Sequence, residues 1–199
     1  EGGANDSVWC LILGPSGPTA LSLAWSTSEP DHVNGSPVLR NGRVYVVDQS
    51  SQIWSIRASD GGDRYSFDLG GSDGKGFPFP DRRNDNLYVT TFNGKVHAVT
   101  DDGSSFSRPW PELDLSPSAP SVLLHWTGTD SLFVGVDQHP LNGGNAGLLH
   151  IDVSTGAIVG NVPLESVPQV IGPPSLDVGN SLLHVGSEAG TLYAVEVPF

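Results

Sequence analysis

Residues 35–48 read GSPVLRNGRVYVVD, residues 52–56 read QIWSI and residues 60–62 read DGG. Short apolar runs separated by Asn-Gly and Gly-Gly predict three antiparallel strands, joined by tight turns and followed by a glycine turn. The whole chain has 199 residues, with 25 Gly and 16 Pro spread along it, and no long stretch has apolar residues at helical spacing. The sequence therefore predicts an all-β protein built from many short strands.

The pattern of residues 35–62 occurs four times. The second strands of the four repeats are centred on Tyr45, Tyr88, Phe133 and His184, at successive separations of 43, 45 and 51 residues. Third strands are expected at residues 53–56, 96–99, 149–152 and 192–195, and fourth strands at 64–69, 105–115 (broken by Pro109 and Pro111) and 157–164. A period in the forties made of four short strands is typical of a β-propeller. Ile53 points to one face of its strand and Trp54 and Ile56 to the other, so neighbouring sheets are expected on both faces.

Two segments carry a family resemblance: residues 93–99 read NGKVHAV and residues 189–195 read AGTLYAV. With the Ser-Pro strand starts and the glycine turns, they resemble the repeat of quinoprotein-like propellers. That family includes pyrroloquinoline-quinone dehydrogenases and the propeller lipoprotein of outer-membrane assembly. The resemblance implies a propeller fold, but its members have about seven or eight blades. A Trp also typically ends each of their repeats, and here only Trp25 clearly does so.

The resemblance does not extend to quinone chemistry. The quinone enzymes of the family need adjacent cysteines, a Trp beneath the cofactor and acidic Ca²⁺ ligands in a wide ring, whereas this chain has one cysteine and about four repeats. We therefore expect no enzyme activity, no cofactor and no metal. A fragment of a larger quinoprotein-like propeller stays open as an alternative.

The formal net charge is -13, and Lys75 and Lys95 are the only lysines. Such a chain repels a phosphate backbone, which excludes nucleic acid as a partner. No run of 18 apolar residues occurs, so no membrane span is expected. The chain starts with Glu1 and lacks Met, and both Asn5 and Asn34 stand in the N-glycosylation pattern. These features favour an extracellular, periplasmic or cell-surface protein.

The two ends of the chain decide whether the ring closes. The fourth repeat stops at Phe199 after its third strand, and residues 19–28 (TALSLAWSTS) read as the missing fourth strand. We therefore expect residues 19–199 to form a four-bladed propeller of four-stranded antiparallel blades, with residues 1–18 as a tail. The residues expected to meet at the ring closure are Leu21, Leu23 and Trp25 on one strand and Leu192, Tyr193 and Val195 on the other.

One strand is then left over. Residues 7–12 (SVWCLI) align with residues 52–56, so the chain has five third strands and four second strands. Three arrangements are open for this extra strand: it is a peripheral fifth strand of a blade, it pairs with a neighbouring molecule, or it is part of a longer propeller. Its side chains are Val8, Trp9, Cys10, Leu11 and Ile12. We favour the second arrangement, which makes the protein a structural propeller that assembles with copies of itself head to tail, with filaments as one outcome.

The runner-up is a monomeric module that binds a ligand, glycan or peptide. Residues 137–147 replace a short hairpin, and Asp137, His139, Asn142 and Asn145 are its candidate ligand contacts. Flexibility of this loop is the simpler explanation of its length. His97, His150 and His184 occupy aromatic columns of the repeat and are expected to pack in the core, whereas His32, His125 and His139 fall near turns and are expected at the surface.

Overall fold

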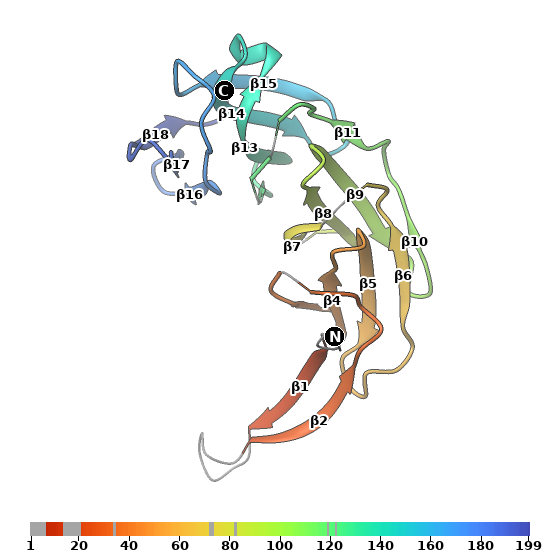
Figure 1. Ribbon diagram of the computed structural model, residues 1–199. Coiled ribbons are helices and arrows are strands. Elements are labelled where there is room, and N and C mark those ends of the chain that lie inside the picture. Colours follow the sequence, from red (N-terminus) through yellow and green to blue (C-terminus); the bar gives the residue numbers. More distant parts are fainter. Residues whose placement is uncertain are drawn as a thin grey trace, which may run out of the picture.

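The computed structural model describes residues 7–13, 21–33, 35–71, 74–81, 83–118, 120–121 and 123–199. Its sheets follow one another along an open arc, with the N-terminal strands at one end and the C-terminal strands at the other (Figure 1). The sheets are antiparallel meanders whose strands pair in sequence order, as short hairpin connections require, apart from the divided outer strand of one sheet. The described residues contain no helix long and apolar enough to cross a membrane.

Three complete blades form the middle of the arc. The first blade contains β3 (Val38–Arg40), β4 (Arg43–Val47), β5 (Gln52–Arg57) and β6 (Tyr65–Asp68). The second contains β7 (Gly74–Pro80), β8 (Asn86–Thr91), β9 (Lys95–Asp101), β10 (Phe106–Ser107) and β11 (Leu113–Asp114). The third contains β12 (Leu124–Trp126), β13 (Ser131–His139), β14 (Asn145–Asp152) and β15 (Ile158–Pro163), with a 3-10 turn η1 (Pro140–Asn142) between β13 and β14.

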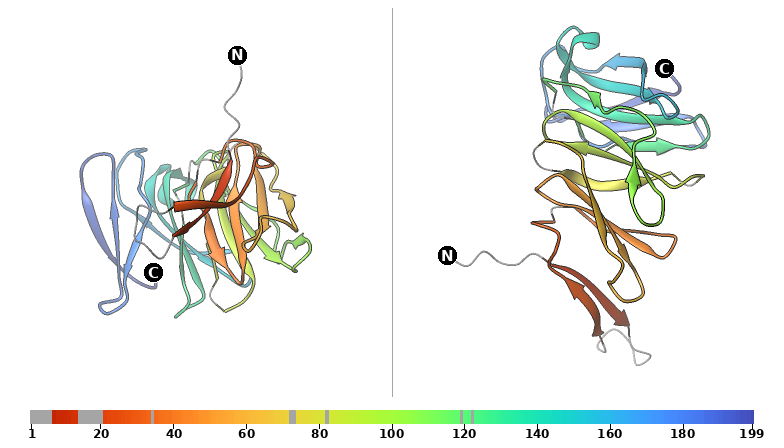
Figure 2. Two further views of the ribbon diagram at one scale, coloured as in Figure 1. Left: turned by 90° about the horizontal axis from the view of Figure 1, so that it is seen from below. Right: turned by 90° about the vertical axis from the view of Figure 1, so that its right-hand side faces the viewer.

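Incomplete sheets stand at the two ends. The N-terminal hairpin contains β1 (Val8–Leu13) and β2 (Leu21–Thr27). The C-terminal sheet contains β16 (Ser175–Asp177), β17 (Leu182–Gly186) and β18 (Leu192–Glu196). Figure 2 shows the sheets as successive layers, with the hairpin as the last layer beside the first blade.

The predicted strands of the repeat are present. The Asn41-Gly42 turn joins β3 to β4 with φ of 48° and 75°, the left-handed geometry of a two-residue hairpin loop. The fourth strand of the second blade is broken as predicted, because β10 and β11 pair separately with β9 on either side of Pro109 and Pro111.

Apolar side chains fill the space between each pair of successive sheets. Ile53 packs in the cluster shared by the first and second blades, whereas Trp54 and Ile56 pack toward the hairpin. The prediction that third strands are covered on both faces is therefore confirmed for β5. The sheets stack because neither face of such a strand can stay in water.

The predicted ring closure differs from the structure. Strand β2 pairs with β1, in a register that sets Cys10 opposite Trp25, and β18 pairs with β17 alone among the described residues. Residues 21, 23 and 25 therefore lie at the opposite end of the arc from residues 192, 193 and 195 (Figure 1). A local hairpin closes a much shorter loop than a pairing across most of the chain, so its entropic cost is lower. The predicted boundary between residues 18 and 19 lies outside the described residues.

Candidate assembly site at the ends of the arc

The N-terminal hairpin has one buried face. Val8 and Trp25 are buried against Val46 and Ile56 of the first blade, and Cys10 is half-buried in the same cluster. The side chains of β1 alternate between the two faces of the strand. Burial of one set therefore fixes which set faces outward.

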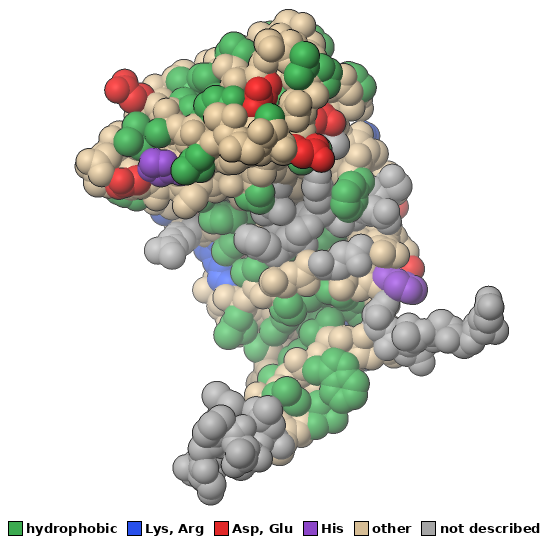
Figure 3. Space-filling model, turned by 60° about the vertical axis from the view of Figure 1, so that its left-hand side comes forward, with side chains coloured by type: hydrophobic (Ala, Val, Ile, Leu, Met, Phe, Trp, Pro, Cys, Tyr) green, Lys and Arg blue, Asp and Glu red, His purple; other side chains and the backbone are tan. Residues whose placement is uncertain are grey.

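The outward-facing side of the hairpin is apolar. Trp9 is 61% exposed and Leu11, on the same face of β1, is 52% exposed; Ile12 on the other face of β1 and Leu23 on β2 are exposed as well. Figure 3 shows hydrophobic side chains gathered over the hairpin at the lower end of the molecule. All five residues of the predicted assembly strand thus belong to β1, three of them exposed and two in contact with the first blade. A contiguous apolar patch of this kind marks an interaction surface more often than a wet surface.

Trp25 holds the hairpin on the first blade. Its indole Nε1 donates a 2.8 Å hydrogen bond to the carbonyl oxygen of Ala58, and its ring lies on Gly61, where a Cβ atom would come within 2.7 Å of the ring. Trp110 repeats this arrangement between the second and third blades. It donates to the Val153 carbonyl oxygen at 2.9 Å and covers Gly156. From the sequence, only Trp25 is expected at this position of the repeat. The second, Trp110, could have been predicted because a glycine turn at Gly156 is available for it to cover.

A groove lies between the hairpin and the first blade. It has a volume of about 340 Å³, and β1, whose other edge pairs with β2, forms one side of it. Leu39, which is 70% exposed, and Val44 line it from the first blade. The full lining is Val8, Trp9, Cys10, Leu11, Trp25, Pro37, Leu39, Val44 and Ala58.

The C-terminal sheet presents a matching surface. Within the described residues β18 pairs on one side only, with β17. Tyr193 and Val195 pack toward the third blade, whereas Leu192, at 74% exposed, and Ala194 face away from it. Both ends of the arc therefore combine an unpaired strand edge with exposed apolar side chains.

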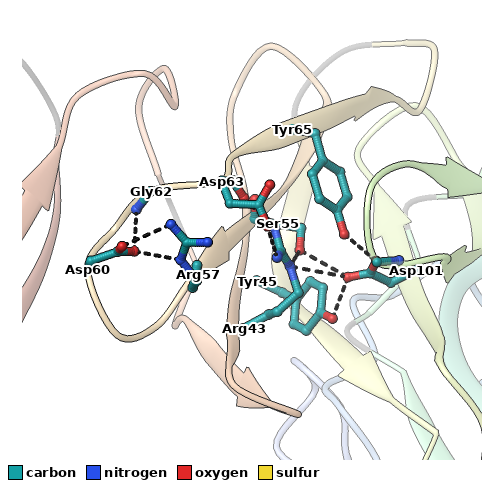
Figure 4. Close-up of polar contacts among 10 residues, drawn as sticks. Arg43, Tyr45, Ser55, Arg57, Asp60, Gly62, Asp63, Tyr65 and Asp101 are labelled. Atoms are coloured by element: carbon teal, nitrogen blue, oxygen red, sulfur yellow. Dashed lines mark hydrogen bonds and ion pairs between the residues drawn. The ribbon is translucent and has the colours of Figure 1, made fainter.

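A polar cluster joins the first and second blades. The buried Asp101 carboxylate accepts hydrogen bonds from the Tyr45 hydroxyl at 2.5 Å, the Ser55 hydroxyl at 3.0 Å and the Tyr65 hydroxyl (Figure 4). The Arg43 guanidinium lies 3.7 Å from the same carboxylate. Burial alone would raise the pKa of Asp101, but the hydrogen bonds from the two tyrosines, the Gly103 N–H and Ser55 outweigh it and hold that pKa below its usual value.

The two tyrosines that donate to the Asp101 carboxylate also have raised pKa values. Burial, together with the hydrogen bond to the Asp101 carboxylate, raises the pKa of Tyr65 to about 12 and raises that of Tyr45 further. Arg57 and Asp60 form an exposed pair beside the cluster at 2.9 Å (Figure 4). A surface hollow of about 410 Å³ opens beside Asp101. Because the buried carboxylate is already saturated with donors from two blades, its role in this arrangement is to connect them.

The loop of residues 137–147 is folded. Strand β13 runs to His139, η1 turns the chain, and β14 begins at Asn145. His139 and Asn142 are buried: the imidazole Nδ1 accepts from the Leu141 N–H at 3.3 Å, and the Asn142 side-chain oxygen accepts from Asn161 at 2.9 Å. Asp137 and Asn145 are half-buried. These internal hydrogen bonds connect η1 to β13 and β15, and the expected flexibility of the loop stays a prediction.

The histidine predictions are confirmed in part. His97 is fully buried and His150 nearly so, and the His150 Nε2 lies 2.8 Å from the Ser131 hydroxyl. His184 is half-buried and His32 is exposed. The surface prediction for His125 and His139 was wrong, since both are buried. His125 packs edge-on against Tyr88 of the second blade, a contact between blades that no local sequence pattern signals.

No group of three His, Cys, Asp or Glu side chains within the described ranges is placed to hold a metal ion. A third cavity, of about 390 Å³, lies over the inner strands β7, β12 and β16. Phe79, His125, Trp126 and Leu176 are among the side chains that line it. Asn5 and Asn34, the candidate glycosylation sites, lie outside the described residues.

No family model and no curated protein matches this chain. Its fold is similar to BamB from Moraxella catarrhalis, with a TM-score of 0.66 and 16% identity over 88% of this chain and 50% of BamB. It is also similar to the computationally designed Ika4 protein (0.62, 11% identity, 85% of this chain and 96% of Ika4) and to the designed Ika8 protein (0.61, 12%, 81% and 45%). These similarities confirm a propeller-type fold, and the chain spans about half the length of BamB.

Proposed function

We propose that this chain is a non-enzymatic protein-interaction module that associates with copies of itself end to end. The N-terminal hairpin of one copy contacts the C-terminal sheet of the next. The observation that carries the proposal is that β1 and β18, at opposite ends of an open arc, each have an edge that pairs with no other described strand. An exposed edge flanked by apolar side chains is a template for pairing with another strand.

The two ends are different surfaces, so the contact between copies is heterologous. Such a contact gives a closed ring if the rotation between copies closes and an open filament if it does not. A ring of two copies is the simplest closed form, because one chain spans half the length of BamB. The proposal places the protein outside the cytoplasm, on the strength of the N-glycosylation patterns at Asn5 and Asn34.

The polar groups support a structural role. The Asp101 carboxylate is saturated by donors from β4, β5 and β6, and the imidazole of His150 is held by Ser131 and by the carbonyl oxygen of Phe199. Groups that are buried and fully hydrogen-bonded contribute to the packing of blades rather than to proton transfer with a substrate. No catalytic residue is therefore part of the proposal.

Two blocked variants test the proposal. Trp9→Asp places a charge on the hairpin surface, and Leu192→Asp places one on the C-terminal sheet. Each variant alone should be monomeric by light scattering, because one of its two contact surfaces, the hairpin or the C-terminal sheet, is blocked. An equimolar mixture should form a dimer and nothing larger, because one intact hairpin and one intact sheet remain between the two chains.

Val159→Asp is the matched control. Val159 is 55% exposed on β15 of the third blade and belongs neither to the N-terminal hairpin nor to the C-terminal sheet, so this variant should assemble like the unmodified protein. A protein that is monomeric at every concentration reached, or blocked variants that assemble like the control, would overturn the proposal.

A further inference from the structure

The groove beside β1 combines two features that a docked strand would satisfy together. One side is β1, which pairs with β2 alone among the described strands and offers backbone N–H and C=O groups along its other edge. The floor is apolar and includes Leu39 and Val44 of the first blade. A strand is the element that pairs with such an edge while it places every second side chain on such a floor.

The three complete blades show which strand is absent there. In each of them the third strand pairs on one side with the second strand and on the other with the outer strand or strands. Strand β1 is equivalent to a third strand, because Trp9 aligns with Trp54 and because Trp25 of β2 docks on Gly61 as Trp110 docks on Gly156. The groove therefore lies along the edge of β1 at which the third strand of every complete blade has another strand as its partner.

Strand β18 has the surface that this place requires. It has an unpaired edge, and its two faces differ: Tyr193 and Val195 are taken up in the core shared with the third blade. Leu192 and Ala194 remain exposed on the other face. Only this second face is available to a partner.

We infer that the groove is the seat for β18 of a second copy of this chain, with Leu192 of that copy against Leu39 and Val44. The inference rests on the proposed end-to-end association and specifies its contact. The seated strand extends the hairpin from two strands to three and covers Leu192 and Leu39, which are 74% and 70% exposed. Side chains alternate between the two faces of the seated β18, so only the face with Leu192 and Ala194 approaches Cys10. Cys10 is half-buried on the groove side of β1.

Cys10 is the only cysteine in the sequence, so a disulfide to one introduced cysteine shows which residue lies beside it. Residues opposite one another on adjacent strands have Cα atoms about 4.5–5.5 Å apart, which is within the range that a disulfide spans. Single cysteines are introduced at Leu192, Ala194 and Tyr193, and the proteins are oxidised and separated on non-reducing gels. Leu192→Cys and Ala194→Cys should give disulfide-linked oligomers, and Tyr193→Cys should give far less.

Two controls keep the result interpretable. Val159 is also exposed, at 55%, but it lies on β15 and does not line the groove, so Val159→Cys should not crosslink to Cys10. The added substitution Cys10→Ser should remove the crosslinks of Leu192→Cys and Ala194→Cys, which shows that they join the two predicted strands. Ala194→Cys keeps Leu192 and tests the seat even if replacing Leu192 weakens association.

Light scattering on the same samples separates the two proposals. If the protein associates but Cys10 crosslinks equally to both faces of β18, or to neither, the seat is wrong while end-to-end association stands. If the protein stays monomeric, both are wrong.

Discussion

The hydroxyl of Tyr45 in β4 donates a 2.5 Å hydrogen bond to the carboxylate of Asp101 in β9, so a polar contact joins the first two blades inside their apolar interface. Ser55 and Tyr65 donate to the same carboxylate. Asp101 is therefore the shared acceptor of three first-blade side chains.

Asp101→Asn should lower the free energy of unfolding by about 2–4 kcal/mol, because it removes the charged acceptor and turns one oxygen into a donor that faces other donors. Tyr45→Phe removes one donor of several and should cost about 1 kcal/mol. Urea denaturation of both variants measures the difference. A loss for Asp101→Asn no greater than that for Tyr45→Phe would contradict the shared-acceptor role.

The same carboxylate should make the protein acid-sensitive. The folded-state pKa of Asp101 lies below its unfolded value of about 3.9, so its stabilising contribution is present above that pH and is lost as the pH falls through the folded pKa. Stability measured from pH 5 downward should therefore fall less steeply in Asp101→Asn. Identical slopes would show that Asp101 titrates alike in both states.

His97 should produce a second pH dependence at higher pH. Burial, aided by the Arg108 guanidinium, lowers the pKa of His97 to about 4, against about 6.5 in an unfolded chain. Between these values the unfolded chain binds the proton and the folded chain does not. Stability should thus decrease by up to about 3 kcal/mol from pH 7 to pH 4, and His97→Gln should remove that part of the slope. Parallel slopes for the two proteins would exclude His97 as the source.

The tryptophan contacts should make two glycines far less replaceable than a third. Gly61 and Gly156 have φ of 69° and 71°, and a Cβ on either would lie within 2.7 Å of a Trp ring atom. Gly103 has φ of 87° with nothing within 4 Å of a Cβ. Gly103→Ala should cost only the backbone strain, about 1 kcal/mol.

Gly61→Ala and Gly156→Ala should cost more than Gly103→Ala, since each also displaces an indole ring that donates to a carbonyl oxygen. Gly61→Ala should additionally weaken association, because Trp25 anchors the hairpin. Equal melting temperatures for the three variants would show that the rings move aside at no cost.

His125 offers a substitution expected to be tolerated. Both ring nitrogens are buried without a hydrogen bond among the described residues, and the nearest Asp81 carboxylate oxygen is 3.9 Å from Nδ1. His125→Phe should keep the edge-on contact with Tyr88 and change stability by less than about 1 kcal/mol, or raise it. Asp81→Ala should destabilise, because Tyr88, Asn84 and the Arg83 N–H donate to that carboxylate. A large loss in His125→Phe would reveal a bonded role for the imidazole.

Several features could be predicted because they are properties of neighbouring residues. The Asn41-Gly42 turn, the two-sided burial of β5 and the break of the outer strand at Pro109 and Pro111 all follow from local conformational preference and strand periodicity. The burial of His125 could not be predicted in this way. It depends on Tyr88, which is far from it in the sequence and approaches only when two blades stack.

The amino-acid sequence by itself determined the strand repeat, the all-β class and the surplus strand at residues 8–12, since alternation and turn chemistry act over a few residues. Only the tertiary structure decided where that surplus strand goes. Strands β1 and β18 compete for equivalent places, and the choice depends on the cost of closing a long loop and on the docking of Trp25 on Gly61. The short loop and the Trp25 contact both favour the hairpin, and in the part of the chain that the structure describes the arc stays open, with an unpaired strand edge at each end.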